Sequence, residues 1–163
     1  DVEYESRWYS SWPLGRVESF TSPSGQEIPI GSLVFEALGL GRFALEICED
    51  GWKGIRPGSR YALAGAEIVC NPSASWFVLG KHAARKRLVE QASAEDHCAY
   101  LYTSLLGCDA TRLVFDGSTL IASDGTTLQE GRRFLFDTQV EIVDCVLDLA
   151  ALRQARLGRP RCG

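Results

Sequence analysis

Residues 42–52 decide the fold, and they read Arg-Phe-Ala-Leu-Glu-Ile-Cys-Glu-Asp-Gly-Trp. The first part, residues 42–47, is short and mostly apolar, which is typical of a buried strand. A glycine-bearing turn follows at once and brings Cys48 to the carboxyl edge of an α/β sheet, where ligands bind. Cys48 is therefore a candidate nucleophile, with backbone N–H groups beside it for an oxyanion. The alternative is a small buried hydrophobic residue.

Composition indicates one soluble globular domain. The 163 residues are 45% apolar and 23% charged, and this length is enough for a hydrophobic core. A net charge of −4 gives no support for nucleic acid or an anionic membrane as a partner. No apolar run reaches the ~20 residues of a membrane-spanning helix. The acidic start is no signal peptide, and the absence of methionine favours a piece of a longer protein.

The six cysteines indicate a reducing compartment. None of them forms a Cys-x-x-Cys pair, and neither histidine stands at metal-ligand spacing from them, so the sequence predicts no metal site. Cys70, Cys98 and Cys145 lie in apolar runs, where we expect inert core thiols. Since a disulfide framework is not expected in such a chain, we predict a cytoplasmic location.

Strands and helices alternate through the middle of the chain. Residues 32–37, 42–47, 66–71 and 99–104 read as strands, and residues 60–65 and 81–94 read as helices. This order predicts βαβ units with parallel strands. The longer helix is amphipathic. We expect its inward face to consist of Ala84, Leu88, Val89 and Ala92, and its wet face of Lys81, Arg85, Lys86, Arg87 and Glu90.

The two ends of the chain show turn signals. Residues 13–31 are rich in proline and glycine and read as a loop or a short hairpin. After a loop at 107–111, antiparallel strands are expected at 113–115, 118–122 and 127–130, joined at the hairpin dipeptides Asp116-Gly117 and Asp124-Gly125. A last strand is expected at 140–147, followed by a helix at 149–156 that Asp148 caps.

Several segments, in order, carry a resemblance to a known family. They are Ile-Cys-Glu-Asp-Gly-Trp at 47–52, Asn-Pro-Ser-Ala-Ser at 71–75, residues 81–88, Gly-Cys-Asp at 107–109 and residues 113–118. The first resembles the nucleophile segment of the nitrilase (carbon–nitrogen hydrolase) superfamily. The second resembles the Asn-x-Ser-x-Ser segment of one branch, the glutaminase domains of glutamine-dependent NAD synthetases. Residues 4–12 are similar to the stretch that follows the catalytic lysine in that branch.

The resemblance implies an α/β fold, the αββα sandwich of nitrilases. Residues 1–163 would form a partial domain, its C-terminal two-thirds, with the synthetase domain absent. The family hydrolyses amides through a cysteine thioester, with a glutamate that moves protons and a lysine that stabilises the oxyanion. No residue of this chain matches that glutamate or that lysine, so we expect the chain alone to be an inactive fragment. No cofactor is expected here, since ATP and Mg²⁺ serve only the synthetase domain.

The resemblance also implies roles for particular residues. Cys48 would be the nucleophile, and Glu49 would offer its backbone N–H to the oxyanion and its side chain to the substrate ammonium group. Ser75 and Lys81 would hold the α-amino and α-carboxylate groups of glutamine. The plainer alternatives are a solvated turn acid for Glu49 and a solvated helix cation for Lys81.

Two aromatic residues complete the predicted site. Trp52 would wall the substrate pocket, and its alternative is a core tryptophan. Tyr4 would face the substrate from the first segment of the chain.

The expected function is hydrolysis of the glutamine amide, which supplies ammonia for ATP-dependent amidation of nicotinic acid adenine dinucleotide to NAD. The expected partners are glutamine, the synthetase domain of the same parent chain and further copies in a homo-oligomer, with no nucleic acid and no membrane. Another nitrilase-type amidase or carbamoylase, or an inactive piece, are the alternatives. The cation at Lys81 favours the glutaminase, because a simple amidase has no substrate carboxylate to pair.

Overall fold

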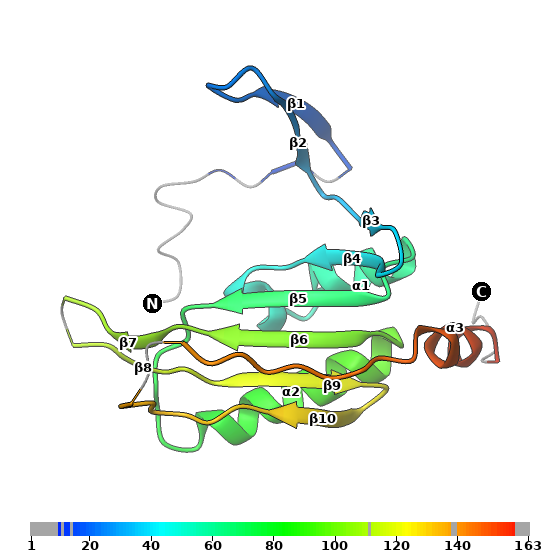
Figure 1. Cartoon of the computed structure of the whole chain (residues 1–163). Coiled ribbons are helices and arrows are strands. Elements are labelled where there is room, and N and C mark those ends of the chain that lie inside the picture. Colours follow the sequence, from blue (N-terminus) through cyan, green and yellow to red (C-terminus); the bar gives the residue numbers. More distant parts are fainter. Residues whose placement is uncertain (1–9, 11, 14, 111, 138–139, 159–163) are drawn as a thin grey trace. The chain divides into compact units, whose positions relative to one another are not determined.

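The computed structural model describes residues 10, 12–13, 15–110, 112–137 and 140–158 (Figure 1). The chain divides into two compact units, Asp1–Leu33 and Val34–Gly163. In the described ranges, no helix is long and apolar enough to cross a membrane.

The smaller unit contains an antiparallel hairpin of β1 (Val17–Thr21) and β2 (Glu27–Gly31). Its turn closes where the Gly25 N–H donates to the Ser22 carbonyl at 2.8 Å. Gly25 has a φ of 82°, a left-handed conformation that glycine adopts without strain. The hairpin predicted as one possibility for residues 13–31 is therefore confirmed.

The larger unit is built on a six-stranded mixed sheet. Across the sheet its strands are β10 (Thr126–Glu130), β9 (Thr119–Ser123), β6 (Ala99–Ser104), β5 (Ile68–Ser73), β4 (Gly41–Leu45) and β3 (Phe35–Ala37). The three central strands β4, β5 and β6 run parallel, as predicted. Strands β3 and β9 pair antiparallel with them on either side. All three parallel strands therefore end at one edge of the sheet.

Two helices cover one face of this sheet, α1 (Pro57–Leu63) and α2 (Lys81–Asp96), and they lie behind it in Figure 1. Val89 and Ala92 of α2 pack on the sheet in a core whose other buried members are Val69, Cys98, Tyr100, Tyr102, Leu120 and Ala122. The first helix begins three residues before the predicted start, because Pro57 occupies its first turn, where a missing N–H does no harm.

The opposite face of the sheet carries residues 141–143, which lie over Leu45, Cys70, Leu101 and Ile121 around a cavity of about 390 Å³. The predicted strand at 140–147 is wrong, since these residues pair with no strand in the described chain. The segment is extended and alternates half-buried and exposed residues, as a strand does. It lies over the face of the sheet instead of along an edge, and so it has no ladder partner there (Figure 1).

The last helix, α3 (Leu149–Leu157), is confirmed together with its cap, because the Asp148 carboxylate accepts from the Ala151 N–H at 2.9 Å. The helix is held at the amino ends of the parallel strands. Arg156 donates to the carbonyls of Ala66 and His97 at 2.5 and 2.8 Å, just before β5 and β6 begin.

Only one of the two predicted hairpin dipeptides forms a hairpin. Asp124-Gly125 joins β9 and β10, as predicted. The prediction for Asp116-Gly117 is wrong, because β8 (Val114–Asp116) pairs with β7 (Leu106–Cys108) and not with β9. The strand β7 also occupies the start of the predicted loop at 107–111. Asp116 is fully buried, so its carboxylate serves an internal ion pair and not an exposed turn.

Arg85 corrects the predicted wet face of α2, because its side chain is fully buried. Its guanidinium pairs with both Asp116 oxygens at 2.8 and 2.9 Å. The other terminal nitrogen donates to the carbonyls of Ser75 and Trp76 at 2.7 and 3.1 Å. Arg85 lies four residues before the core residue Val89, which places both on the same face of the helix.

We expect Arg85→Met to lower the free energy of unfolding by about 3–5 kcal/mol, because it leaves the Asp116 charge buried without its main partner. Urea unfolding of the variant and the wild type measures the difference. Arg87→Met is the matched control, since Arg87 is exposed two residues further along α2, and its effect should stay within about 0.5 kcal/mol. Equal effects of the two substitutions would contradict the structural role of the ion pair.

Candidate functional site

Cys48 lies at the carboxyl end of β4, on a tight turn. It opens the short 3₁₀ helix η2 (Cys48–Trp52) and has a φ of 49°. A non-glycine residue in this left-handed conformation is uncommon, and such conformations cluster at functional turns. The turn is closed by the Asp50 N–H, which donates to the Ile47 carbonyl at 3.0 Å. The Cys48 side chain is half-buried.

The strand next to β4 leads to the second part of the site. Ser75 follows the end of β5, and Lys81 is the first residue of α2. Because β4 and β5 are parallel, the Cys48 turn and this loop start from the same edge of the sheet. The Lys81 ammonium lies 4.1 Å from the centre of the Trp76 ring, a cation–π contact.

The charges around Lys81 include that of Cys48. Burial lowers the pKa of Lys81, and the Arg85 guanidinium lowers it further. Cys48 and Asp116 act on the same pKa in the opposite direction but are outweighed. Lys81 is thus a partly desolvated cation within electrostatic reach of the candidate nucleophile.

Ser75 is buried and held from two sides. Its N–H donates to Ser104 Oγ, and its Oγ accepts from the Arg85 guanidinium, both at 3.2 Å. A hydroxyl that accepts one hydrogen bond still has its own O–H to donate. The structure therefore leaves Ser75 able to donate a hydrogen bond, from a fixed position.

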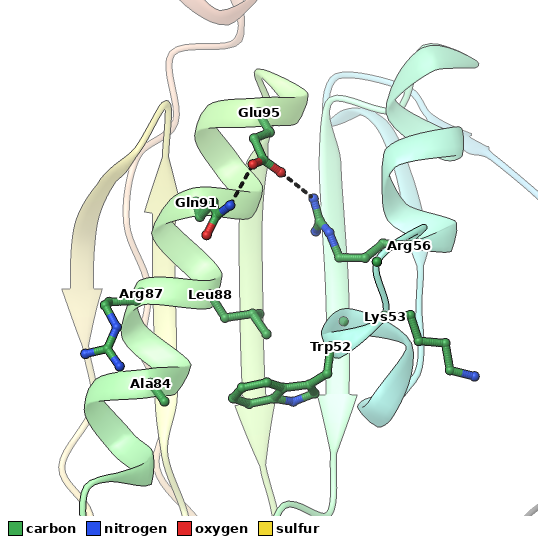
Figure 2. A pocket seen from close by; sticks show the side chains of 10 residues that line it. Trp52, Lys53, Arg56, Ala84, Arg87, Leu88, Gln91 and Glu95 are labelled. Carbon is green, nitrogen blue, oxygen red and sulfur yellow. Dashed lines mark hydrogen bonds and ion pairs between the residues drawn. The ribbon is translucent and has the colours of Figure 1, made fainter.

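The remaining predicted residues lie in three different surroundings. The half-buried Glu49 side chain makes no ion pair within the described ranges. Trp52 is 44% exposed, which excludes the core alternative. It lines a groove of about 480 Å³ with Ala84 and Leu88 of α2, as Figure 2 shows, and Cys48 is not part of that lining. Tyr4 lies outside the described residues.

The other glutamates near these strands bind other partners, and the other thiols near them are buried or half-buried. Glu46 is buried and accepts from the Gly58 N–H at 2.6 Å. Glu67 binds Arg153 at the opposite edge of the sheet. Cys98 is fully buried, as predicted for a core thiol, and burial raises its pKa to about 12, whereas Cys70 and Cys145 are half-buried. Among the residues the structure describes, no three metal-ligating side chains form a group.

Sequence reasoning missed several polar residues that surround the site, namely Asn71, Trp76, Tyr100, Arg85 and Asp116. A signal existed for Arg85, because helical spacing places it on the inward face with Val89. Asn71 gave a weaker signal as a polar residue that ends an apolar strand. Tyr100 gave none, since a tyrosine in a buried strand is ordinary.

The protein is therefore an α/β protein with a candidate thiol site. The site consists of a left-handed cysteine turn at the carboxyl ends of the parallel strands, beside a partly buried lysine. The family model for carbon–nitrogen hydrolases matches residues 6–156, and the chain belongs to this family. The predicted family and its α/β fold are thereby confirmed.

Relatives and solved structures agree with this assignment. The chain is 33% identical over 160 residues to a glutamine-dependent NAD(+) synthetase from Bos taurus, which covers 93% of the chain but 22% of the relative. A glutamine-dependent NAD(+) synthetase structure from Cytophaga hutchinsonii has a TM-score of 0.69 and 36% identity, over 80% of this chain and 20% of that one. A nitrilase-superfamily member from Saccharomyces cerevisiae, 18% identical, shares the fold with a TM-score of 0.66 over 91% of this chain and 52% of that one.

The lowered pKa of Lys81 predicts a stability effect with a defined sign. The folded protein binds the Lys81 proton less tightly than the unfolded chain, so the charged lysine reduces stability at neutral pH. This reduction disappears as the pH rises from the folded to the unfolded pKa. The free energy of unfolding of Lys81→Met, relative to that of the wild type, should therefore be highest near neutral pH and should fall as the pH rises.

Lys86 on the same helix provides a control of opposite sign. Its hydrogen bond to Glu130 raises its pKa, so its contribution is present near neutral pH and is lost as the pH rises through the raised value. Urea unfolding of wild type, Lys81→Met and Lys86→Met between about pH 7 and pH 11 measures both trends. The same trend for both variants would contradict the burial of Lys81.

Proposed function

We propose that this chain is the part of a glutaminase that carries the nucleophile, Cys48. The observation that carries the proposal is the left-handed Cys48 turn at the carboxyl edge of the parallel strands, with the Lys81 cation within electrostatic reach. The similarity to proteins described as glutamine-dependent NAD(+) synthetases supports glutamine as the substrate.

The proposed chemistry is amide hydrolysis through a thioester. The Cys48 thiolate attacks the carboxamide carbon of glutamine, a carbon–sulfur bond forms and the oxygen becomes an oxyanion. The N–H of Glu49, the first amide after the nucleophile, supports this oxyanion. The carbon–nitrogen bond then breaks as the nitrogen takes up a proton and leaves as ammonia. Water attacks the thioester, glutamate leaves and the thiol is restored.

Two groups in this scheme have no counterpart in the chain. Proton transfer needs a general base, and full stabilisation of the oxyanion needs a second donor. The oxygens of Glu46 and Glu67 are taken by other partners, and neither residue stands where the family has its glutamate. We therefore assign the general base and the second oxyanion donor to residues of the full-length protein other than these 163.

Substrate selection follows from the loop after β5. The Lys81 ammonium pairs with the α-carboxylate of glutamine. The Ser75 O–H and the Glu49 carboxylate bind the polar groups of the same amino-acid head group. Lys81 is partly desolvated, which strengthens an ion pair with an incoming carboxylate. This pairing stabilises a positive charge that burial disfavours in the free protein.

In the full-length protein, the ammonia is used to amidate nicotinic acid adenine dinucleotide, with ATP and Mg²⁺ bound by a separate synthetase domain. The curated relatives are several times longer than this chain, which spans about 22% of the bovine protein, so there is room for such a domain in a parent of their length. We also propose that the full-length enzyme is cytoplasmic and homo-oligomeric.

Cys48→Ala in the full-length protein should abolish glutamine-dependent NAD synthesis and leave ammonia-dependent synthesis intact, because only release of ammonia needs the thiol. The two rates are measured side by side with glutamine or an ammonium salt as nitrogen source. Cys108→Ala is the control, since Cys108 is an exposed thiol on β7 to which the proposed reaction gives no role. Glutamine hydrolysis near the wild-type rate in Cys48→Ala would refute the assignment of the nucleophile.

Lys81→Ala should raise KM for glutamine strongly, because truncating one partner of a partly desolvated ion pair costs about 2–5 kcal/mol. Lys81→Arg should be milder, since the charge is kept. The measurement is kcat/KM for glutamine and for a simple amide without the amino-acid head group. Lys86→Ala on the same helix is the control. An unchanged preference in Lys81→Ala would favour a general amidase or carbamoylase.

A further inference from the structure

A chain of buried polar side chains lies beneath the Cys48 turn. Asn71, Tyr100 and Glu46 come from the three parallel strands β5, β6 and the end of β4, and all three are no more than 1% exposed. They lie on the face of the sheet that α1 and α2 cover. Buried polar groups persist only when they are hydrogen-bonded, so their partners show what they hold in place.

The hydrogen bonds in this chain run in one direction. Ser73 Oγ donates to Asn71 Oδ1 at 2.6 Å, which fixes the orientation of the amide. The amide nitrogen then donates to the Tyr100 hydroxyl at 3.1 Å and to the Cys48 carbonyl at 3.3 Å. The Tyr100 hydroxyl donates in turn to the Glu46 carboxylate. Such linked hydrogen bonds strengthen one another in a low dielectric.

Glu46 connects this chain of hydrogen bonds to the helices. Its second oxygen accepts from the Gly58 N–H in the first turn of α1 at 2.6 Å, and the Arg56 guanidinium lies 3.8 Å from the first oxygen. Arg56 also pairs with Asp96 at the end of α2 at 2.8 Å. The Glu46 carboxylate therefore has fixed partners on α1 and on the residue just before it, Arg56.

The turn itself rests on the same side chains. A Cβ added to the buried Gly51 would lie 2.7 Å from the Asn71 amide nitrogen and 3.0 Å from the Tyr100 hydroxyl. Both distances are at or below the closest approach of real side chains. Asn71 and Tyr100 thus touch the η2 turn by packing at Gly51 as well as by the hydrogen bond to Cys48.

We propose that Asn71 and Tyr100 are positioning residues for the nucleophile, anchored by Glu46, and that they hold the Cys48 turn in its left-handed conformation. This inference rests on the proposed function of Cys48. A cysteine in this conformation is retained only where the surroundings enforce it, and Asn71 is the described side chain that binds the Cys48 carbonyl.

The strand β6 itself supplies a matched control. Tyr102 lies two residues beyond Tyr100, on the same face of the strand, and is 2% exposed. Its hydroxyl has no hydrogen-bond partner among the described residues. Removing this hydroxyl changes the same chemical group in the same core and leaves the hydrogen bonds to Cys48 intact.

The experiment compares Tyr100→Phe, Tyr102→Phe and Gly51→Ala in the full-length protein. The first readout is kcat and KM for glutamine. The second is the rate of iodoacetamide alkylation at Cys48, followed peptide by peptide and divided by the rate at the exposed Cys108. Alkylation of the buried Cys98 reports global unfolding, because this thiol is reached only when the core opens.

Tyr100→Phe should lower kcat about 10- to 100-fold with little change in KM, because a displaced nucleophile slows attack without weakening the head-group contacts. The Cys48-to-Cys108 alkylation ratio should fall at least about threefold, and Cys98 should stay protected. Tyr102→Phe should stay within about twofold of wild type in both readouts. Gly51→Ala should resemble Tyr100→Phe, because its methyl group displaces the same amide.

Equal behaviour of Tyr100→Phe and Tyr102→Phe, with Cys98 protected in both, overturns the inference. If alkylation of Cys98 shows that Tyr100→Phe is unfolded, the inference is tested with Gly51→Ala instead, by kinetics and by the Cys48-to-Cys108 alkylation ratio. A failure of the proposed function looks different, since Cys48→Ala would then retain activity. In that case the alkylation ratio alone still decides whether Asn71 and Tyr100 hold the turn.

Discussion

The arrangement of the site depends on one buried ion pair, between Arg85 of α2 and Asp116 at the end of β8. Both side chains are fully removed from water, a loss that the pair must offset through close geometry and further hydrogen bonds. Arg85 meets this requirement by also binding the carbonyls of Ser75 and Trp76. A helix, a strand and an irregular loop are thereby tied to one guanidinium. If the loop shifted, the buried Arg85 guanidinium would lose hydrogen bonds that help to compensate for its burial.

Much of the larger unit could be predicted because its signals are local. The apolar run before Cys48 gives β4 and the glycine-bearing turn gives η2, whereas the start of α1 at Pro57 lies three residues before the predicted one. The prediction of a wet face for Arg85 is wrong because its helical spacing, shared with Val89, outweighs its charge, and its partner Asp116 lies 31 residues away. The segment at 140–147 has the alternation of a strand, but pattern alone cannot supply the neighbour that a strand needs.

The candidate site shows the same division. The place of Cys48 at the carboxyl edge could be predicted from the apolar run before it, whereas the roles expected for Ser75 and Lys81 came from the family resemblance. The support beneath Cys48 could not be predicted, since Glu46 and Tyr100 are 54 positions apart and meet only when β4 and β6 flank β5. Trp52 shows the opposite case. It is adjacent in sequence to the nucleophile segment, yet it lines a separate groove against α2.

The alternation of residues 140–147 also bears on how the chain behaves in solution. Its outward side carries Ile142 and Val146, which are 86% and 96% exposed, and the Asp144 carboxylate interrupts this row of β-branched side chains. Extended backbone with outward apolar side chains is the starting point for cross-β stacking between copies. A net charge of −4 gives such copies little mutual repulsion. Concentrated samples of the chain should therefore associate first through this segment, while the α/β core stays folded.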